Sequence, residues 1–183
     1  MKNKNRAVYR LVIIAICVAF MALCSYITIP FAVNFSLQLF AVFLIAGCFP
    51  TIISVSATTL YFIIGAIGIP VFSGFNSGLS AILGASGGFL VSFPLIALMI
   101  SVFQKYYAKN SFLYILVASI SLIVCYTIGS LWYMYVFCYP NPCSFMTALA
   151  VSVFPFVIFD IAKMLLAFVL LKKLRPFVDR LSI

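Results

Sequence analysis

The sequence predicts an all-α polytopic membrane protein: a bundle of six transmembrane helices with both termini in the cytoplasm, forming a single transmembrane domain over residues 1–183. The chain is 67% hydrophobic and 7% charged, whereas soluble domains carry about 25% charged residues. Neither 11–104 nor 110–159 contains Asp, Glu, Lys or Arg. Uncharged segments of this length are apolar enough to cross a bilayer.

The first three helices are delimited by prolines. We expect the first at 9–29, before Pro30, and interpret it as retained because it lacks a clear small-residue cleavage site. The next two are expected at 36–49 and 51–68, with Pro50 between them, because proline breaks a helix that precedes it.

The other three helices are expected at 79–103, 112–137 and 146–171, with Pro176 just beyond the last. Each is long enough to cross the hydrocarbon core, which takes about 20 helical residues. A loop rich in glycine, at 68–78, precedes the first of these three helices.

The basic residues indicate the orientation. The net charge is +9, but position favours topology signals and anionic lipid headgroups over nucleic acid. Both termini and the loop near residue 107 are basic and are therefore expected in the cytoplasm. All Lys and Arg residues except Lys163 fall in three clusters that flank hydrophobic segments. The clusters are Lys2, Lys4, Arg6 and Arg10; Lys105 and Lys109; and Lys172, Lys173, Arg175 and Arg180.

Residues that are missing exclude several functions. The chain has no histidine and no glutamate, which excludes His-based catalytic triads, His metal sites and HExxH chemistry. It also has no GxxxxGK[ST] motif, so it does not hydrolyse ATP by P-loop chemistry. We expect no enzyme activity, and any ATP-driven process would need partner subunits.

The candidate site centres on Asp160 and Lys163, the only charged residues within 146–171. A charge facing lipid would cost several kcal/mol, so both side chains are expected to face the protein interior or a wet cavity. Their i, i+3 spacing places them on one face of a helix. This predicts a polar substrate site. The alternative is a buried structural ion pair, and the long Lys163 side chain can also reach toward an interface.

Neutral polar groups and glycines supply further candidates. The stretch 73–88, SGFNSGLSAILGASGG, combines Asn76, Ser77 and Ser80 with glycines such as Gly87. Glycine lets a ligand or a neighbouring helix approach closely, so these positions serve either ligand contact or packing. Gln38 and Asn34 lie in an apolar segment, where amides bind a ligand or join helices.

Three other features have two interpretations each. Ala15 and Ala19 form a small-xxx-small pair that suits internal packing or a docking face for another membrane protein. Trp132 belongs either to an interfacial aromatic belt or to a ligand cavity. Cys138 and Cys143 lie in a predicted external loop, where they are either free thiols or a disulfide.

Three ordered motifs resemble the BioY family, the biotin-binding S components of energy-coupling factor (ECF) transporters. The strongest is GIPVFSGFNSGLSAILGASGGFLVSFP at 68–94. The second is YITIP at 26–30 followed by NFSLQ at 34–38, and the third is FPFVIFDIAKMLLA at 154–167. Asp160 and Lys163 match the family's Asp and Lys in its last helix.

The resemblance implies a six-helix, multi-pass subunit of the plasma membrane that captures biotin from outside. A separate transmembrane T component and two ATPase subunits would drive uptake, with Ala15 and Ala19 at the T component. Biotin would be a transported ligand rather than a cofactor. Asp160 would accept from a ureido N–H and Lys163 would donate to the carbonyl, or meet the valerate carboxylate. Asn76 and Gln38 would complete the polar set, and Phe35 and Phe75 would cover the ring.

Two other functions remain open on the sequence. One is an S component for another small heterocyclic vitamin, with the same fold and different polar partners. The other is a structural membrane protein, in which Asp160 and Lys163 only pair helices.

Overall fold

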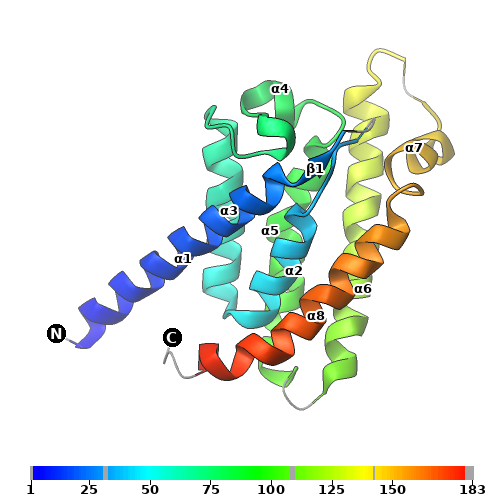
Figure 1. Cartoon of the computed structure of the whole chain (residues 1–183). Helices are drawn as coiled ribbons and strands as arrows, with labels where there is room; N and C mark the ends of the chain where they lie inside the picture. The colour runs from blue at the N-terminus through cyan, green and yellow to red at the C-terminus, as the bar shows by residue number, and fades with distance from the viewer. Residues whose placement is uncertain (1, 31–32, 108–109, 142, 180–183) are drawn as a thin grey trace.

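The computed structural model describes residues 2–30, 33–107, 110–141 and 143–179. These residues are mostly helical (Figure 1). The helices are α1 (Lys2–Tyr26), α2 (Gln38–Cys48), α3 (Thr51–Ala66), α4 (Gly78–Ile82), α5 (Gly87–Val102), α6 (Ser111–Trp132), α7 (Phe145–Ser152) and α8 (Val157–Asp179), with shorter helical turns at Ser73–Phe75, Gln104–Tyr106 and Tyr133–Phe137.

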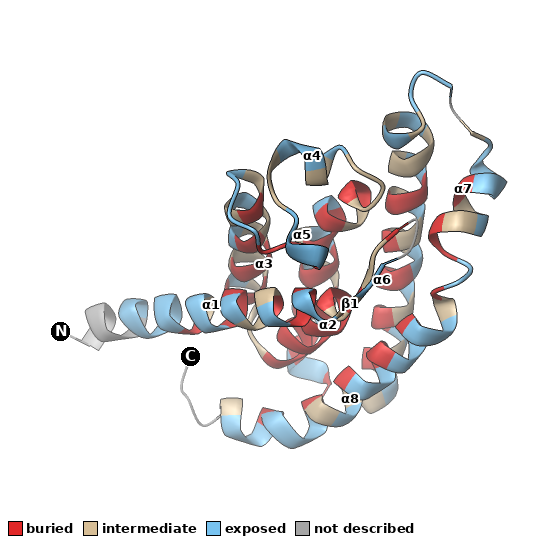
Figure 2. Ribbon diagram, turned by 45° about the horizontal axis from the view of Figure 1, so that its top comes forward, coloured by how far each residue is buried: buried red, intermediate tan, exposed pale blue. Residues whose placement is uncertain are grey.

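Helix α2 forms the centre of the bundle. All eleven of its residues are buried, as expected of a helix that is hydrophobic on every side. It contacts α1, α3, α5 and α8, and Figure 2 shows buried positions concentrated on the helices around it. The N-terminal part of α1 extends away from this bundle (Figure 1).

The predicted helix at 79–103 is in fact two helices, α4 and α5, with a break at residues 83–86. The break brings the carbonyl of Ile82 against the start of α5: a Cβ added to Gly87 would lie 1.6 Å from that oxygen. Gly84 and Ser86, which are poor helix formers, lie in the break. Hydropathy alone did not predict it, because the whole segment is apolar.

The predicted helix at 146–171 is also broken. Helices α7 and α8 meet at an angle of 57°, and Pro155 lies in the break between them. Proline has no N–H and its ring clashes with the preceding turn, which ends a helix. The prediction for Pro176 was wrong as well, since this residue lies within α8 rather than beyond it.

A short antiparallel hairpin is the exception to the all-α prediction. Strand β1 (Thr28–Ile29) pairs with β2 (Phe35–Ser36), with Thr28 opposite Ser36. The first helix therefore ends at Tyr26 rather than residue 29, because the residue before Pro30 is driven toward extended backbone. The hairpin positions Phe35 beside α8.

Both termini and the α5–α6 connection lie at one end of the bundle, and the hairpin, α4 and the α6–α7 connection lie at the other (Figure 1). Lys109 and Arg180, two of the predicted topology signals, are outside the described residues. Two described helices, Ala7–Tyr26 and Ser111–Phe137, are long and apolar enough to cross a membrane. A third span is formed if α7 and α8 are taken together, whereas α2, α3 and α5 are shorter apolar helices.

Candidate functional site

Asp160 and Lys163 form a buried ion pair near the start of α8. Lys163 Nζ donates to Asp160 Oδ1 at 2.8 Å, and each residue is only 6% exposed. Asp160 lies in the first turn of α8, where the positive end of the helix dipole favours a carboxylate. Both charges face the protein interior, as the sequence predicted.

Tyr126 supplies the second hydrogen bond to the Asp160 carboxylate. Its hydroxyl donates to Asp160 Oδ2 at 2.8 Å, so both oxygens of Asp160 have a partner within the protein. Each carboxylate oxygen has two lone pairs, and each can therefore accept a further hydrogen bond from a ligand. The sequence analysis missed Tyr126, because one tyrosine among several on an apolar helix carries no distinguishing signal.

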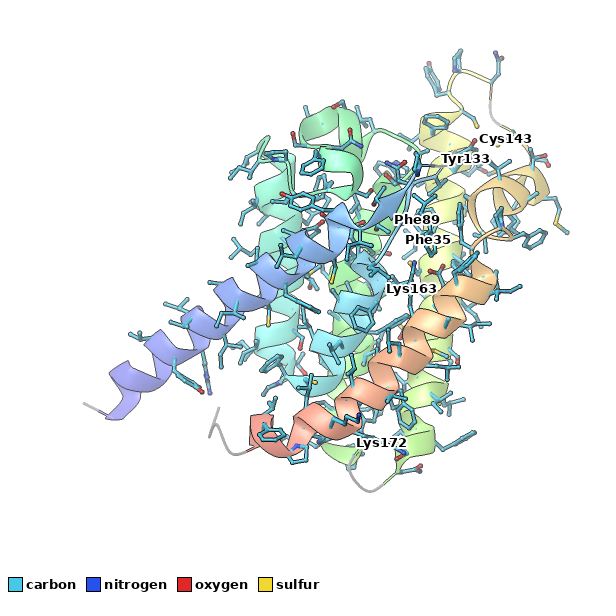
Figure 3. The ribbon with its side chains drawn as sticks, viewed as in Figure 1. Phe35, Phe89, Tyr133, Cys143, Lys163 and Lys172 are labelled. Atoms are coloured by element: carbon cyan, nitrogen blue, oxygen red, sulfur yellow. The ribbon has the colours of Figure 1, made fainter. Side chains whose placement is uncertain are left out.

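An aromatic group covers the pair on the hairpin side. Lys163 Nζ lies 3.7 Å from the centre of the Phe35 ring, a cation–π contact. Phe35 also stacks on Phe156 at 5.8 Å and meets Phe159 edge-on at 5.1 Å. Figure 3 shows Phe35 and Phe89 above Lys163.

A cavity of about 60 Å³ adjoins the pair; we call it the inner cavity. Five predicted residues line it: Asn34, Phe35, Gln38, Asp160 and Lys163. Other lining residues were not among the predictions, notably Ser86, Phe89, Phe93, Ser152 and Phe156. Small-molecule sites usually have this composition, in which apolar and aromatic walls surround a few polar groups.

A larger cavity of about 260 Å³, the outer cavity, lies beside the Gly-rich loop. Asn76 and Ser80 line it, as does Ser73. Asn34 and Ser86 line both cavities, which places the two spaces next to each other. The amide of Asn76 donates to the Ser73 carbonyl at 2.8 Å, so part of its hydrogen-bonding capacity holds the loop.

Gln38 joins three segments. Its side-chain oxygen accepts from the Ser36 hydroxyl at 2.9 Å, and its Nε2 donates to the Tyr61 hydroxyl. Tyr61 in turn donates to the carbonyl of Val71 at 2.6 Å. Gln38 therefore lines the inner cavity and also ties α2 to the hairpin, to α3 and to the loop that follows α3.

Four candidates lie outside the linings of both cavities. Phe75 is 66% exposed and stacks on Tyr26 at 4.3 Å, and the Ser77 carbonyl accepts from Ser80 at 3.2 Å. Gly87 is where α5 meets α4 and Trp132 closely: an added Cβ would lie 2.8 Å from the indole nitrogen. That nitrogen, Trp132 Nε1, is buried without a hydrogen-bond partner among the described residues.

The two remaining pairs lie elsewhere. Ala15 and Ala19 are exposed on α1, which disfavours the internal-packing interpretation. Cys138 and Cys143 are free thiols that share a hydrogen bond across 3.2 Å, so the structure contains the thiol form of this pair rather than a disulfide.

A buried ion pair beside an aromatic-walled cavity, inside an apolar helical bundle, places this chain among helical membrane proteins with a candidate internal site. The chain belongs to the BioY family, whose model matches residues 1–180.

Named relatives agree with this membership. The chain is 34% identical to the "Biotin transporter BioY2" of Lactococcus lactis over 89% of this chain and 88% of that protein. It is 32% identical to the "Probable biotin transporter BioY" of Pyrococcus horikoshii over 78% and 81%. The "Biotin transporter BioY" of Thermotoga maritima is 31% identical over 82% and 86%.

A solved structure shares the fold. It is described as the S-component for biotin from an ECF-type ABC transporter, and it matches with a TM-score of 0.83 at 23% identity. The match covers 94% of this chain and 93% of that one.

Proposed function

We propose that this protein captures biotin at the outer face of the plasma membrane and acts as the substrate-binding S component of an ECF-type transporter. The observation that carries the proposal is the Asp160–Lys163 pair, buried beside the inner cavity and bonded to Tyr126. The names of the BioY relatives support biotin as the ligand.

The chemistry of the pair suits a ureido ring. Asp160 accepts hydrogen bonds from the ring N–H groups, and Lys163 donates to the ring carbonyl while it orients the carboxylate. Charge-assisted hydrogen bonds are roughly twice as strong as neutral ones, and a dry cavity strengthens them further. Phe35 and Phe89 supply apolar contacts to the bicyclic ring, and Gln38 keeps the hairpin in place.

Binding requires the two cavities to act together. The inner cavity, at about 60 Å³, is small beside ligand pockets of roughly 300–1,000 Å³. We propose that the ligand's ring occupies the inner cavity and its chain extends past Asn34 and Ser86 into the outer cavity. Asn76 and Ser80 would then face the ligand's chain, and the loop at 73–78 would act as a gate to the two cavities.

The proposed topology is a single transmembrane domain of six crossings with both termini in the cytoplasm. The termini and the α5–α6 connection share one end of the bundle (Figure 1), and the basic clusters belong to these three segments of the sequence. The gate and both cavities would then face outward. The broken pairs α4–α5 and α7–α8 would each count as one crossing.

Uptake would need a T component and two ATPase subunits, because this chain has no P-loop motif. The exposed pair Ala15 and Ala19 on α1 is the proposed docking face for the T component. Small residues allow the backbone of another helix to approach closely.

Biotin binding by the purified protein in detergent tests the proposal. Asp160→Asn should abolish tight binding, while Asp179→Asn, at the only other acidic residue in the chain, should bind as the parent does. Binding that survives in Asp160→Asn would move the site elsewhere. Folded parent protein that binds another vitamin in preference to biotin would make this an S component for that ligand.

A further inference from the structure

The outer cavity is the uncharged part of the proposed biotin site. Its polar side chains are all neutral: Asn34, Ser73, Asn76, Ser80 and Ser86. Every residue that lines it falls within 34–86 or is Phe137, and the sequence has no Asp, Glu, Lys or Arg in 11–104 or 110–159. The segments that form this cavity therefore contribute no side-chain charge to it.

The cations of the chain belong to other segments. Apart from Lys163, all of them fall by sequence in the two termini and the α5–α6 connection. In the described part of the chain, these segments lie at the opposite end of the bundle from the hairpin and α4 (Figure 1). Helix α5 alone, which separates Ser86 from Lys105, has 16 residues and spans roughly 24 Å. No described cation of these clusters is therefore within hydrogen-bond reach of the outer cavity.

Lys163 is held at the inner cavity. Its Nζ donates to Asp160 Oδ1 at 2.8 Å and lies 3.7 Å from the centre of the Phe35 ring. It lines the inner cavity and does not belong to the outer lining. A ligand whose ring bonds to the Asp160–Lys163 pair therefore extends its chain away from the Lys163 charge.

The start of α5 is the other feature that could attract an anion, because the first turn of a helix carries partial positive charge. A carbonyl oxygen already lies beside it: a Cβ added to Gly87 would clash with the Ile82 oxygen and lie 2.8 Å from Trp132 Nε1. The backbone N–H of Gly87 also donates to the Gly84 carbonyl at 3.1 Å. Acceptors of the chain itself thus take the place that an anion would need.

The hydrogen-bonding groups of the outer cavity suit an amide better than a carboxylate. The Nδ2 groups of Asn34 and Asn76 both donate to the Ser73 carbonyl, at 3.5 and 2.8 Å. Each side chain keeps its Oδ1 acceptor and one N–H for a ligand. An amide can pair with both of these groups, whereas a carboxylate has only acceptors, and burial of a carboxylate without a cation is costly.

We propose that the site binds amides of biotin, in which the chain end is neutral, as readily as it binds free biotin. This inference rests on the proposed capture of biotin, with the ring in the inner cavity and the chain in the outer one. The Asp160–Lys163 pair selects the ureido ring. The outer cavity does not reject a neutral chain end, because rejection requires a charged partner that the neutral ligand leaves unpaired.

Isothermal titration of the full chain in detergent with biotin, biotin amide and lipoate tests this inference. Biotin amide carries –CONH2 in place of the carboxylate, whereas lipoate keeps the pentanoate chain and the carboxylate but has no ureido ring. Biotin amide should bind within about threefold of biotin, and lipoate should not bind. A larger loss for biotin amide would overturn the inference, because a carboxylate bound by a cation contributes roughly ten- to a hundredfold in affinity. Lipoate that binds as tightly as biotin would overturn it too, since the carboxylate would then be the group selected.

A cation added to the outer cavity supplies a second test. Ser80→Lys places an ammonium at an exposed position of the lining and should make the protein prefer biotin to biotin amide roughly tenfold. Leu79→Lys is the matched control, because it adds the same charge at an adjacent exposed residue that lines neither cavity. Its preference should equal that of the parent. Equal preference in Ser80→Lys and Leu79→Lys would overturn the placement of the chain end in the outer cavity.

The same titrations separate this inference from the proposed function. A folded parent that binds biotin but not biotin amide would overturn the inference and leave the proposed function intact. A folded parent that binds neither compound would overturn both. Thermal unfolding without ligand checks that the parent and each variant are folded.

Discussion

The hydroxyl of Tyr126 donates a 2.8 Å hydrogen bond to Oδ2 of Asp160, the oxygen that Lys163 leaves available. One carboxylate thereby joins α6 to α8 and has a fixed orientation toward the inner cavity. A ligand N–H meets an acceptor that is already aligned, which lowers the entropic cost of binding.

Tyr126→Phe tests this alignment. Loss of one hydrogen bond to a charged group should weaken biotin binding by about 1.5–3 kcal/mol, roughly ten- to a hundredfold. The ring stays in place, so the protein should remain folded. Isothermal titration in detergent measures the effect. Unchanged affinity in a folded Tyr126→Phe variant would show that the tyrosine is not needed to orient Asp160.

Asp160→Asn tests whether the pair serves stability as well as binding. The substitution leaves the Lys163 ammonium buried without a carboxylate, which costs about 3–5 kcal/mol. The double variant Asp160→Asn/Lys163→Met removes both charges and should regain most of that stability. Thermal unfolding without ligand measures both variants.

Biotin binding by the same double variant separates the two roles of the pair. If the pair contacts the ligand, binding stays lost although stability returns. Binding that recovers together with stability would support the structural interpretation, in which Asp160 and Lys163 only pair helices.

Two glycines should respond differently to substitution. A Cβ on Gly87 would lie 1.6 Å from the Ile82 carbonyl, so Gly87→Ala should destabilise the protein by roughly 1–3 kcal/mol through overpacking. Gly78 has open space around it but a φ of +73°, so Gly78→Leu strains only the loop, by roughly 1–2 kcal/mol.

The proposed gate makes a kinetic prediction for the same loop. Gly78→Leu, or a bulky residue at Gly74 (φ +72°), should slow biotin association more than it lowers the melting temperature. Stopped-flow binding measures the association rate. Parent-like rates in well-folded variants would exclude a gating role for this loop.

Cys138 and Cys143 should show linked reactivity. The pKa of Cys143 is raised, first by its hydrogen bond with Cys138 and then by burial. Only a thiolate reacts with iodoacetamide, so alkylation of Cys143 should need a higher pH than an ordinary thiol does. Cys138→Ala should move that profile to lower pH, as mass spectrometry can follow. An unmoved profile would mean that Cys138 does not control Cys143.

Hydropathy predicted most of the helices but not their breaks. The helix α2 and the helix α3 were expected within a few residues of their observed bounds, because Pro50 marks the junction in the sequence. The breaks at 83–86 and 153–156 were missed, since apolar character continues through them. Both breaks lie at the site: the first supplies Ser86, and the second supplies Phe156 and the first turn of α8 that holds Asp160.

The sequence by itself determined that this is a membrane protein with a charged pair turned inward, and it indicated the BioY family. Charge and hydropathy suffice for the membrane assignment and the inward-facing pair, because a bilayer penalises an exposed charge wherever the chain places it, whereas the family was indicated by the three motifs. Only the tertiary structure decided what surrounds the pair. Tyr126 and Phe35 reach it from other segments, and Phe75 stacks on Tyr26 outside both cavities. Such contacts depend on how helices cross and where they break, and a linear pattern of apolar residues does not encode that geometry.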